Sequence, residues 1–304
     1  MSRYMQVTIV IGLAIFWAIN WPIMKIGLTT VEPWAFRAFV VVVGGIGCLT
    51  MSLALGQSIR IPSTDLKPLL WLALFQGVLW NAFSGFGIAM VDAGRASVLG
   101  FTMPVWATLL AMIFLKEPVT ARRLAGLGIG MIAMALLLVP ALNAMGTKLT
   151  GALLMIAGAI VWAVATIIVK AVDWEIGMMA LAGWQFVIGS IPLVLAAVLF
   201  GDLASLLEVN RVTGAALAYS ALIPMIFCQT VWFTIVRRLP TSLASTGTLL
   251  VPPLGVYSAA VILGETVGFF EFTALALVVF ALVLILPGFN WRASLHPPQA
   301  SRPE

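Results

Sequence analysis

Apolar stretches of helical length recur along the whole chain, and short polar stretches with charged residues, glycine or proline separate them. A helix needs roughly 20 mainly apolar residues to cross the hydrocarbon core of a bilayer. The pattern therefore predicts an all-α, polytopic membrane protein. Ten transmembrane helices are expected near residues 6–24, 34–54, 69–90, 95–115, 121–140, 150–170, 177–200, 213–235, 242–263 and 268–287.

The composition favours the same class of protein. Of the 304 residues, 62% are hydrophobic and 9% are charged, whereas soluble domains carry about 25% charged residues. The first apolar segment lacks an Ala-x-Ala-like cleavage site, so we expect a retained span and not a signal peptide. The net charge of +5 comes from basic residues scattered at segment ends. This scatter argues against a surface that binds nucleic acid.

The distribution of Lys and Arg predicts the orientation, because cytoplasmic loops are enriched in these residues. With the N-terminus inside, eleven of the sixteen basic residues fall on the cytoplasmic side and four on the other side. The sixteenth, Arg37, lies within the second span. Both termini are therefore predicted to be cytoplasmic. The polar, Pro-containing stretch 290–304 is predicted to be a disordered tail.

Two decapeptides share a pattern of Trp and Lys. Residues 16–25 read FWAINWPIMK and residues 161–170 read VWAVATIIVK, so a Lys follows a Trp by eight positions in both. A shift of 148 residues aligns ASVLGFTMPVW at 96–106 with ASTGTLLVPPL at 244–254. The same shift pairs Pro104 with Pro252, Glu117 with Glu265, Arg37 with Gln185, and Asn81 with Gln229.

These matches predict two homologous halves of five spans each, over residues 1–144 and 145–289. Because five is an odd number, the second half must be inverted in the membrane relative to the first. Inverted repeats are a common architecture of secondary transporters, since two mirrored halves can expose one central site to either side in turn. Gene duplication also occurs in channels and structural membrane proteins, so the repeat favours a carrier without proving one.

The Trp-Ala and Lys pattern of spans one and six, with the endings LKE and LGE after spans four and nine, resembles the drug/metabolite transporter superfamily. Within it, the chain is similar to ten-span EamA-type carriers and, through its many Trp and Phe residues, to YddG-type exporters of aromatic and neutral amino acids. The resemblance implies a basket-like helical bundle in the bacterial inner membrane. It also implies a central cavity lined by spans one to four and six to nine, braced from outside by spans five and ten.

Several aromatic residues are candidates for the substrate site. Trp17 and Trp162 fall near the middle of their spans, and Trp80 and Trp232 share this position less clearly. Trp usually concentrates at the membrane interfaces, so a Trp at mid-depth either packs between helices or lines a cavity. A cavity-lining Trp can stack a flat side chain or attract an ammonium group. We predict Trp17, Trp80 and Trp162 as substrate-binding residues.

Polar residues within the spans extend the predicted substrate site. Asn20, Asn81, Gln185 and Gln229 are expected to face the interior, where amides form interhelical hydrogen bonds or bind both ends of a zwitterion. Arg37 lies about one turn into the second span. There it either snorkels to the surface or holds a substrate carboxylate through two hydrogen bonds.

A second group of residues is predicted to have structural or gating roles. Lys25 lies near the same membrane face as Arg37 and is the second candidate for a carboxylate contact. Glu117 and Glu265 end spans four and nine, where they satisfy helix ends or basic neighbours, or act in gating. Pro104 and Pro252 mark places where helices can bend and let a bundle rock.

The residues that most membrane enzymes need are missing from the predicted spans. No span contains His, and no acidic residue is predicted near a bilayer centre. We therefore predict no enzyme activity, metal or cofactor. Without a proton-relay carboxylate, facilitated diffusion or exchange is favoured. We expect a monomeric carrier in membrane lipid that exports neutral or aromatic amino acids; another metabolite, a drug-like cation, or a channel function are the alternatives.

Overall fold

The computed structural model describes residues 3–114, 120–144, 147–238 and 241–285, and every regular element in these ranges is helical. The first half of the chain contains α1 (Arg3–Gly27), α2 (Pro33–Ala54), α3 (Ser63–Leu72), η1 (Ala73–Leu79), α4 (Trp80–Met90), α5 (Ala93–Gly100), α6 (Met103–Phe114) and α7 (Ala121–Ala144). The second half contains α8 (Thr147–Ala171), α9 (Met178–Phe200), η2 (Leu203–Leu206), α10 (Arg211–Ser220), η3 (Ala221–Cys228), α11 (Gln229–Arg238), α12 (Thr241–Leu263) and α13 (Phe269–Ile285). The tail predicted at 290–304 lies outside the described residues.

The all-α prediction is confirmed in the described ranges, and much of the helical structure is apolar. Six stretches there are long and apolar enough to cross a membrane, namely Pro33–Ala54, Ser63–Met90, Ala93–Phe114, Thr147–Ala171, Met178–Phe200 and Arg211–Phe233. Four shorter apolar helices overlap the other predicted spans, at Ile11–Gly27, Leu124–Leu137, Leu250–Leu263 and Phe269–Leu284.

Three predicted spans are not uniform α-helices. The spans predicted at 69–90 and 213–235 each pass through a π-helical segment, η1 and η3, in which backbone hydrogen bonds reach five residues back instead of four. The span predicted at 95–115 breaks after α5 and resumes as α6. Pro104 is the second residue of α6, a position where proline's missing N–H costs no helical hydrogen bond.

Local sequence signals begin and end the helices. Glu32 precedes α2, and its Oε2 accepts a hydrogen bond from the backbone N–H of Ala35 at 3.0 Å, while Pro33 occupies the first helical position. Gly56 follows α2 and Gly264 follows α12. Both have a φ of 70°, which strains other L residues. These glycines turn the chain back toward the bundle.

Glycines also let α2 and α9 pack closely. A Cβ placed on Gly45 of α2 would lie 2.8 Å from the backbone N of Val187. A Cβ on Gly183 of α9 would lie 2.7 Å from the side chain of Leu49. Small residues at helix crossings allow this close backbone approach in membrane proteins.

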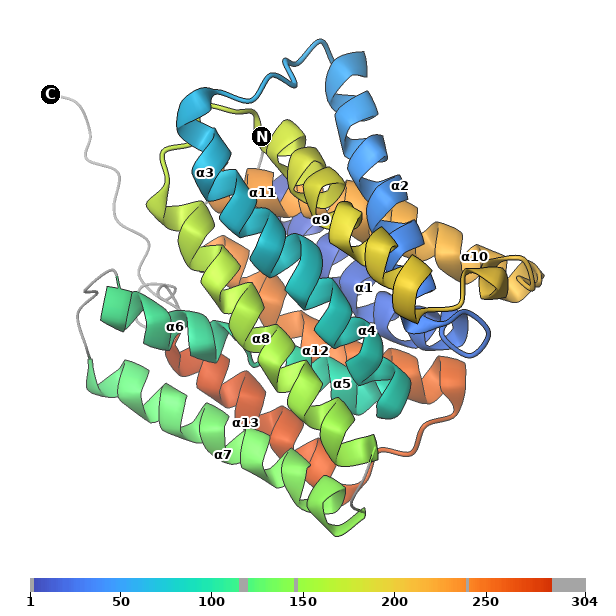
Figure 1. Cartoon of the computed structure of the whole chain (residues 1–304). Helices are drawn as coiled ribbons and strands as arrows, with labels where there is room; N and C mark the ends of the chain where they lie inside the picture. Colours follow the sequence, from blue (N-terminus) through green and yellow to red (C-terminus); the bar gives the residue numbers. More distant parts are fainter. Residues whose placement is uncertain (1–2, 115–119, 145–146, 239–240, 286–304) are drawn as a thin grey trace, which may run out of the picture.

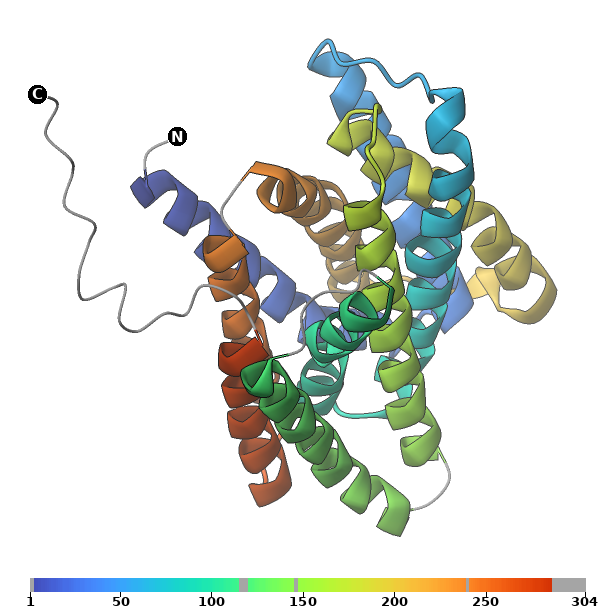
Figure 2. The same ribbon diagram turned by 90° about the vertical axis from the view of Figure 1, so that its left-hand side faces the viewer.

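Helices far apart in the sequence lie side by side. α1 packs along α12, α4 along α8, and α7 along α13. In Figure 1, α7 and α13 lie together at one edge of the molecule, and Figure 2 shows the same pair below the other helices. This place at the edge agrees with the bracing role that the resemblance implied for the fifth and tenth spans.

The two ends of the bundle can be told apart, because α1 and α4 end at one of them and α8 begins there. Lys25, in the last turn of α1, donates a hydrogen bond to Ile88 near the end of α4. A Cβ on Gly151, near the start of α8, would lie 2.6 Å from the Cβ of Met90. α8 therefore runs antiparallel to both α1 and α4. We call this end the Lys25 end; Lys170, in the last turn of α8, lies at the opposite end.

Candidate functional site

Four tryptophans from four helices meet inside the bundle. The ring of Trp17 (α1) has its centroid 6.4 Å from that of Trp162 (α8) and 5.5 Å from that of Trp232 (α11). The ring of Trp80 (α4) lies 4.9 Å from that of Trp162. Two of these three contacts are edge-to-face, a geometry that aromatic pairs prefer. We call the four residues the Trp cluster; it joins all three predicted tryptophans and adds Trp232.

The Trp cluster is partly open. All four side chains are only partly buried, unlike the fully buried core around them. A small residue makes room for one ring, because a Cβ on Gly158 of α8 would lie 3.3 Å from the ring of Trp80. Indole faces in such a position can stack a planar side chain or attract a cation.

Arg37 is buried between α2 and α4, with 3% of its surface exposed. Its Nη2 donates a hydrogen bond to Ser84 Oγ at 2.8 Å, and its Nη1 donates one to Asn81 Oδ1 at 3.4 Å. Gly85 makes room for the side chain, because a Cβ there would lie 2.9 Å from Arg37 Cγ. The guanidinium therefore lies inside the bundle, and the snorkelling alternative for Arg37 is wrong.

The positive charge of Arg37 is not balanced within the described part of the chain. No carboxylate there lies within ion-pair distance of the guanidinium, and its Nε has no hydrogen-bond partner. A guanidinium stays protonated in proteins, and a buried charge without a counter-charge is strongly unfavourable. The surroundings of Arg37 are thus suited to an anionic group on a ligand.

Asn81 is held by the π-helical segment η1. Its Nδ2 donates hydrogen bonds to the carbonyl oxygens of Gln76 and Gly77, at 3.0 and 2.9 Å. These two bonds fix the amide so that Oδ1 accepts the bond from Arg37. The side chain is fully buried, which confirms that Asn81 faces the interior.

The predicted glutamines are buried with unused hydrogen-bonding groups. Gln185 on α9 is 0% exposed, and neither of its side-chain polar atoms has a partner among the described residues. The Nε2 of Gln229, at the start of α11, has none there either. Each such group costs about 1–3 kcal/mol, so both are available to bind a ligand. Asn20 differs, because it accepts a hydrogen bond from Ser220 Oγ at 3.1 Å.

Lys25 lies apart from these groups, at the Lys25 end. Its Nζ donates hydrogen bonds to the carbonyl oxygens of Ile88, Ala89 and Val91, at 2.7, 3.0 and 2.7 Å. The ammonium thereby uses all three of its donors on the end of α4. Lys25 is a helix-capping residue in this conformation and does not contribute to the Trp cluster.

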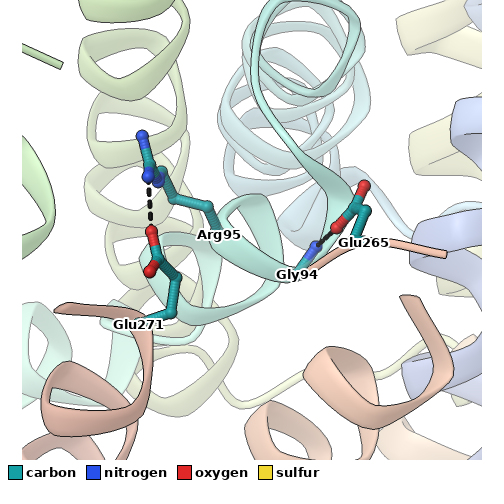
Figure 3. Close-up of polar contacts among 4 residues, drawn as sticks. All are labelled: Gly94, Arg95, Glu265 and Glu271. Atoms are coloured by element: carbon teal, nitrogen blue, oxygen red, sulfur yellow. Dashed lines mark hydrogen bonds and ion pairs between the residues drawn. The ribbon is translucent and has the colours of Figure 1, made fainter. Parts of the chain in front are cut away.

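Glu265 occupies the corresponding place at the start of α5 (Figure 3). Its two carboxylate oxygens accept hydrogen bonds from the backbone N–H groups of Ala93 and Gly94, at 2.7 and 2.8 Å. Beside it, Arg95 of α5 forms an ion pair with Glu271 in the first turn of α13. Glu265 thus lies at a helix end, although the helix is not the one that it follows in sequence.

The other predicted residues are more dispersed. Pro252 lies inside α12, Pro104 begins α6, and Glu117 lies outside the described residues. The sequence analysis missed Ser84, whose only signal is its position three residues after Asn81 on the same face of α4. It also missed the pair formed by Arg95 and Glu271, residues that nothing in the sequence links.

A cavity of about 800 Å³ lies at the end of the bundle opposite the Lys25 end. It opens between the α2–α3 connection and the residues before α9, and Arg60 and Glu175 are among its lining residues. None of the predicted site residues lines it. We therefore treat it as separate from the candidate site.

Apolar helices around a buried guanidinium, unpaired amides and a Trp cluster define a helical membrane protein with a polar interior site, as transporters have. The chain matches the EamA-like transporter family over residues 5–139 and again over residues 149–286, and it belongs to that family. The recognition of the drug/metabolite transporter superfamily from sequence is thus confirmed. The protein is a multi-pass membrane transporter, and this family gives it a role in transport, not in enzymatic catalysis.

Individual relatives are more distant. The chain is 23% identical to an uncharacterized transporter, YoaV, of Bacillus subtilis, over 82% of this chain and 85% of the relative. It is 24% identical to a probable amino-acid metabolite efflux pump of Escherichia coli, over 92% of this chain and 94% of the relative. One crystal structure, 18% identical, superposes with a TM-score of 0.68 over 97% of this chain and 99% of that chain, which supports the fold.

Proposed function

We propose that this protein is a ten-span, alternating-access carrier that exports small amphipathic metabolites, chiefly neutral and aromatic amino acids, across the bacterial inner membrane. The observation that carries the proposal is a buried guanidinium without a counter-charge among the described residues, hydrogen-bonded to α4, the helix that bears Trp80 of the cluster. Arg37 binds Asn81 and Ser84, and Ser84 Oγ donates a hydrogen bond to the carbonyl of Trp80 at 2.6 Å. Arg37 and the Trp cluster are thus connected through one turn of α4.

This arrangement suits an amino acid better than a purely apolar compound. A carboxylate would balance the charge of Arg37 through charge-assisted hydrogen bonds. A flat or apolar side chain would pack on the partly open indoles, and an ammonium group would be attracted to an indole face. Gln185 and Gln229 would gain the partners that they lack. The printed name of the Escherichia coli relative, an amino-acid metabolite efflux pump, supports this substrate class.

Three observations support two inverted halves around the site. The family matches the chain twice, over residues 5–139 and 149–286. The π-helical segments η1 and η3 begin at Ala73 and Ala221, which are 148 residues apart, like the sequence matches. Finally, α1 and α8, which carry the matching Trp and Lys residues, run antiparallel. Mirrored halves of this kind can open one central site to either side in turn.

A counterflow assay tests the proposal. The purified protein is placed in liposomes, and uptake of radiolabelled phenylalanine, methionine and threonine is measured with and without unlabelled substrate inside. We expect saturable uptake that internal substrate stimulates. Trp17→Ala should reduce it about tenfold, since the ring contacts two other members of the Trp cluster and aromatic contacts contribute up to about 1.5 kcal/mol. Trp71→Ala is the matched control, because Trp71 is 50% exposed and stacks on Phe75, away from the Trp cluster.

The outcomes separate the alternatives. If folded protein takes up none of the three amino acids, the amino-acid assignment is wrong and other metabolites or cations must be screened. Uptake that internal substrate does not stimulate would indicate a channel. An equal loss in Trp17→Ala and Trp71→Ala would remove the Trp cluster from the substrate site.

A further inference from the structure

Two charged residues from distant parts of the chain hold the junction between α4 and α5. α4 ends at Met90 and α5 begins at Ala93, with the extended residues Val91 and Asp92 between them. The last carbonyls of α4 carry partial negative charge, and the first N–H groups of α5 carry partial positive charge. Without partners, these backbone groups would be exposed where the helix breaks.

Lys25 and Glu265 satisfy both sides of this break with complementary charge. The ammonium of Lys25 binds three carbonyls at the end of α4, and the carboxylate of Glu265 binds two N–H groups at the start of α5. Each charge therefore opposes the helix dipole that it faces.

Lys25 and Glu265 come from one pair of packed helices and the end of α4 belongs to another pair, while α5 packs against both α12 and α8. Lys25 lies on α1 and Glu265 follows α12, and these helices pack along each other. The end of α4 instead packs against the start of α8, through Met90 and Gly151. The contact of Glu265 with Gly94 in Figure 3 holds the start of α5, and the bonds of Lys25 hold the end of α4. Through the two-residue junction between α4 and α5, both charges tie the α1–α12 pair to the α4–α8 pair.

A buried tryptophan fills the space between this link and the Trp cluster. Trp17, Trp21 and Lys25 are spaced four residues apart on α1, so they lie along one face of the helix. Trp21 is 6% exposed, and its ring centroid lies 6.4 Å from that of Phe101, just after α5. A Cβ on Gly100 would lie 2.8 Å from the Trp21 ring. Trp21 therefore packs against the break between α5 and α6, at a height on α1 between Trp17 and Lys25.

We propose that Lys25 and Glu265 form a two-charge clamp that holds the α1–α12 pair against the α4–α8 pair and keeps the central site closed at the Lys25 end. Releasing the clamp lets the two pairs separate and expose the site at that end. The equivalent lysine of the second half, Lys170, is exposed at the opposite end. The clamp is thus formed at the Lys25 end in this conformation. The proposal does not depend on the identity of the substrate.

Distance measurements between spin labels test the clamp. Labels are attached to cysteines at Lys148, at the start of α8, and at Val267, after α12; both side chains are exposed. The native cysteines Cys48 and Cys228 are buried, and the wild-type chain treated with the same label shows whether they react. Pulsed electron paramagnetic resonance then gives the distribution of distances between the two helix pairs in the full chain.

Removing either charge should open the Lys25 end. We expect Lys25→Met and Glu265→Gln each to raise the population at long distance by roughly fivefold or more, because each substitution leaves a helix end without its charged partner. Lys170→Met is the matched control and should not lengthen the distance. The same variants in the counterflow assay should change the rate of uptake without abolishing substrate binding.

Two results would overturn the clamp. One is an unchanged distance distribution in both variants when each elutes as a single folded species. The other is an equal lengthening in Lys170→Met. If Lys25→Met does not fold, Glu265→Gln decides alone, since glutamine keeps the size of the side chain. A shift in distances in a protein that transports no amino acid would leave the clamp intact and reject the proposed substrate.

Discussion

At the scale of single residues, the interior polar groups differ in how completely they are satisfied. Asn81 donates both amide hydrogens to η1 and accepts one hydrogen bond from Arg37. Arg37 and Gln185 keep unused donors or acceptors in the described structure. Leaving such groups unpaired is costly in a bundle that excludes water. Because of this cost, we propose that a ligand completes the hydrogen bonding of Arg37 and Gln185.

The first prediction concerns Arg37 and the carboxylate of the substrate. In Arg37→Gln, uptake of phenylalanine should fall between tenfold and a hundredfold, because a hydrogen bond to a charged group contributes about 1.5–3 kcal/mol. Phenylalaninamide, which lacks the carboxylate, should compete equally well in the wild type and the variant. Competition in the counterflow assay measures both effects.

A variant at the opposite end controls for the loss of a positive charge. Arg60→Gln removes an exposed guanidinium from the separate cavity and should leave uptake unchanged. Arg37→Lys should restore only part of the activity, since an ammonium cannot reproduce the planar fork that meets Asn81 and Ser84. If phenylalaninamide loses as much potency as phenylalanine in Arg37→Gln, the role of Arg37 is to hold the helices together, and it does not bind the substrate carboxylate.

The sequence predicted these residues by their depth in a span but could not predict their partners. Trp17 and Trp162 stand out because tryptophan is unusual at mid-depth, and the structure brings them into contact. Whether Arg37 snorkels or turns inward depends on the space beside Gly85 and on Ser84, residues from another helix. A hydropathy pattern contains no information about such a pairing.

At the scale of helices, close crossings depend on glycines that face each other. η1 and α9 approach at Gly77 and Gly189, where a Cβ on Gly189 would lie 2.7 Å from the Cα of Gly77. The neighbouring residues include Gln76, whose carbonyl anchors Asn81, and Gln185, one turn before Gly189. The crossing therefore sets the position of two predicted site residues as well as the packing of the helices.

The second prediction is that Gly189→Ala destabilises the protein. The added methyl group meets backbone atoms, which cannot move aside as a flexible side chain can, and overpacking of this kind costs about 1–3 kcal/mol. Thermal unfolding in detergent should show a lower midpoint. Gly128→Ala, where a Cβ would meet no atom within 4 Å, should leave the midpoint close to that of the wild type. Equal shifts in the two variants would mean that the crossing tolerates the methyl group.

The positions of the helices were predictable, whereas their internal irregularities were not. Length and hydropathy place the apolar helices to within a few residues, because the thickness of the bilayer fixes the number of apolar residues. The π-helical segments η1 and η3 keep the same apolar composition as their neighbours, so hydropathy cannot detect them. The break between α5 and α6, at Phe101 and Thr102, has apolar residues on both sides, so hydropathy cannot detect it either.

At the scale of the whole molecule, the helix directions bear on how the chain lies in the membrane. α1 ends at the Lys25 end, and α13 begins there, where Glu271 pairs with Arg95. The start of α1 and the end of α13 are therefore both at the opposite end. Lys25, Arg95 and Lys148, three of the four basic residues predicted on the non-cytoplasmic side, lie at the Lys25 end.

The third prediction is that a reporter changes sides between the two halves. Alkaline phosphatase, which is active only outside the cytoplasm, and a fluorescent protein, which is bright only inside it, are fused after residue 146 or after residue 304. Five crossings in the first half should place the first junction outside, and ten crossings should place the second inside. The phosphatase should therefore be active at 146 and the fluorescent protein bright at 304. Cytoplasmic reporters at both junctions would mean that the first half crosses the membrane an even number of times. The two halves would then have the same orientation in the membrane, and the inverted repeat on which the proposed alternating access depends would be wrong.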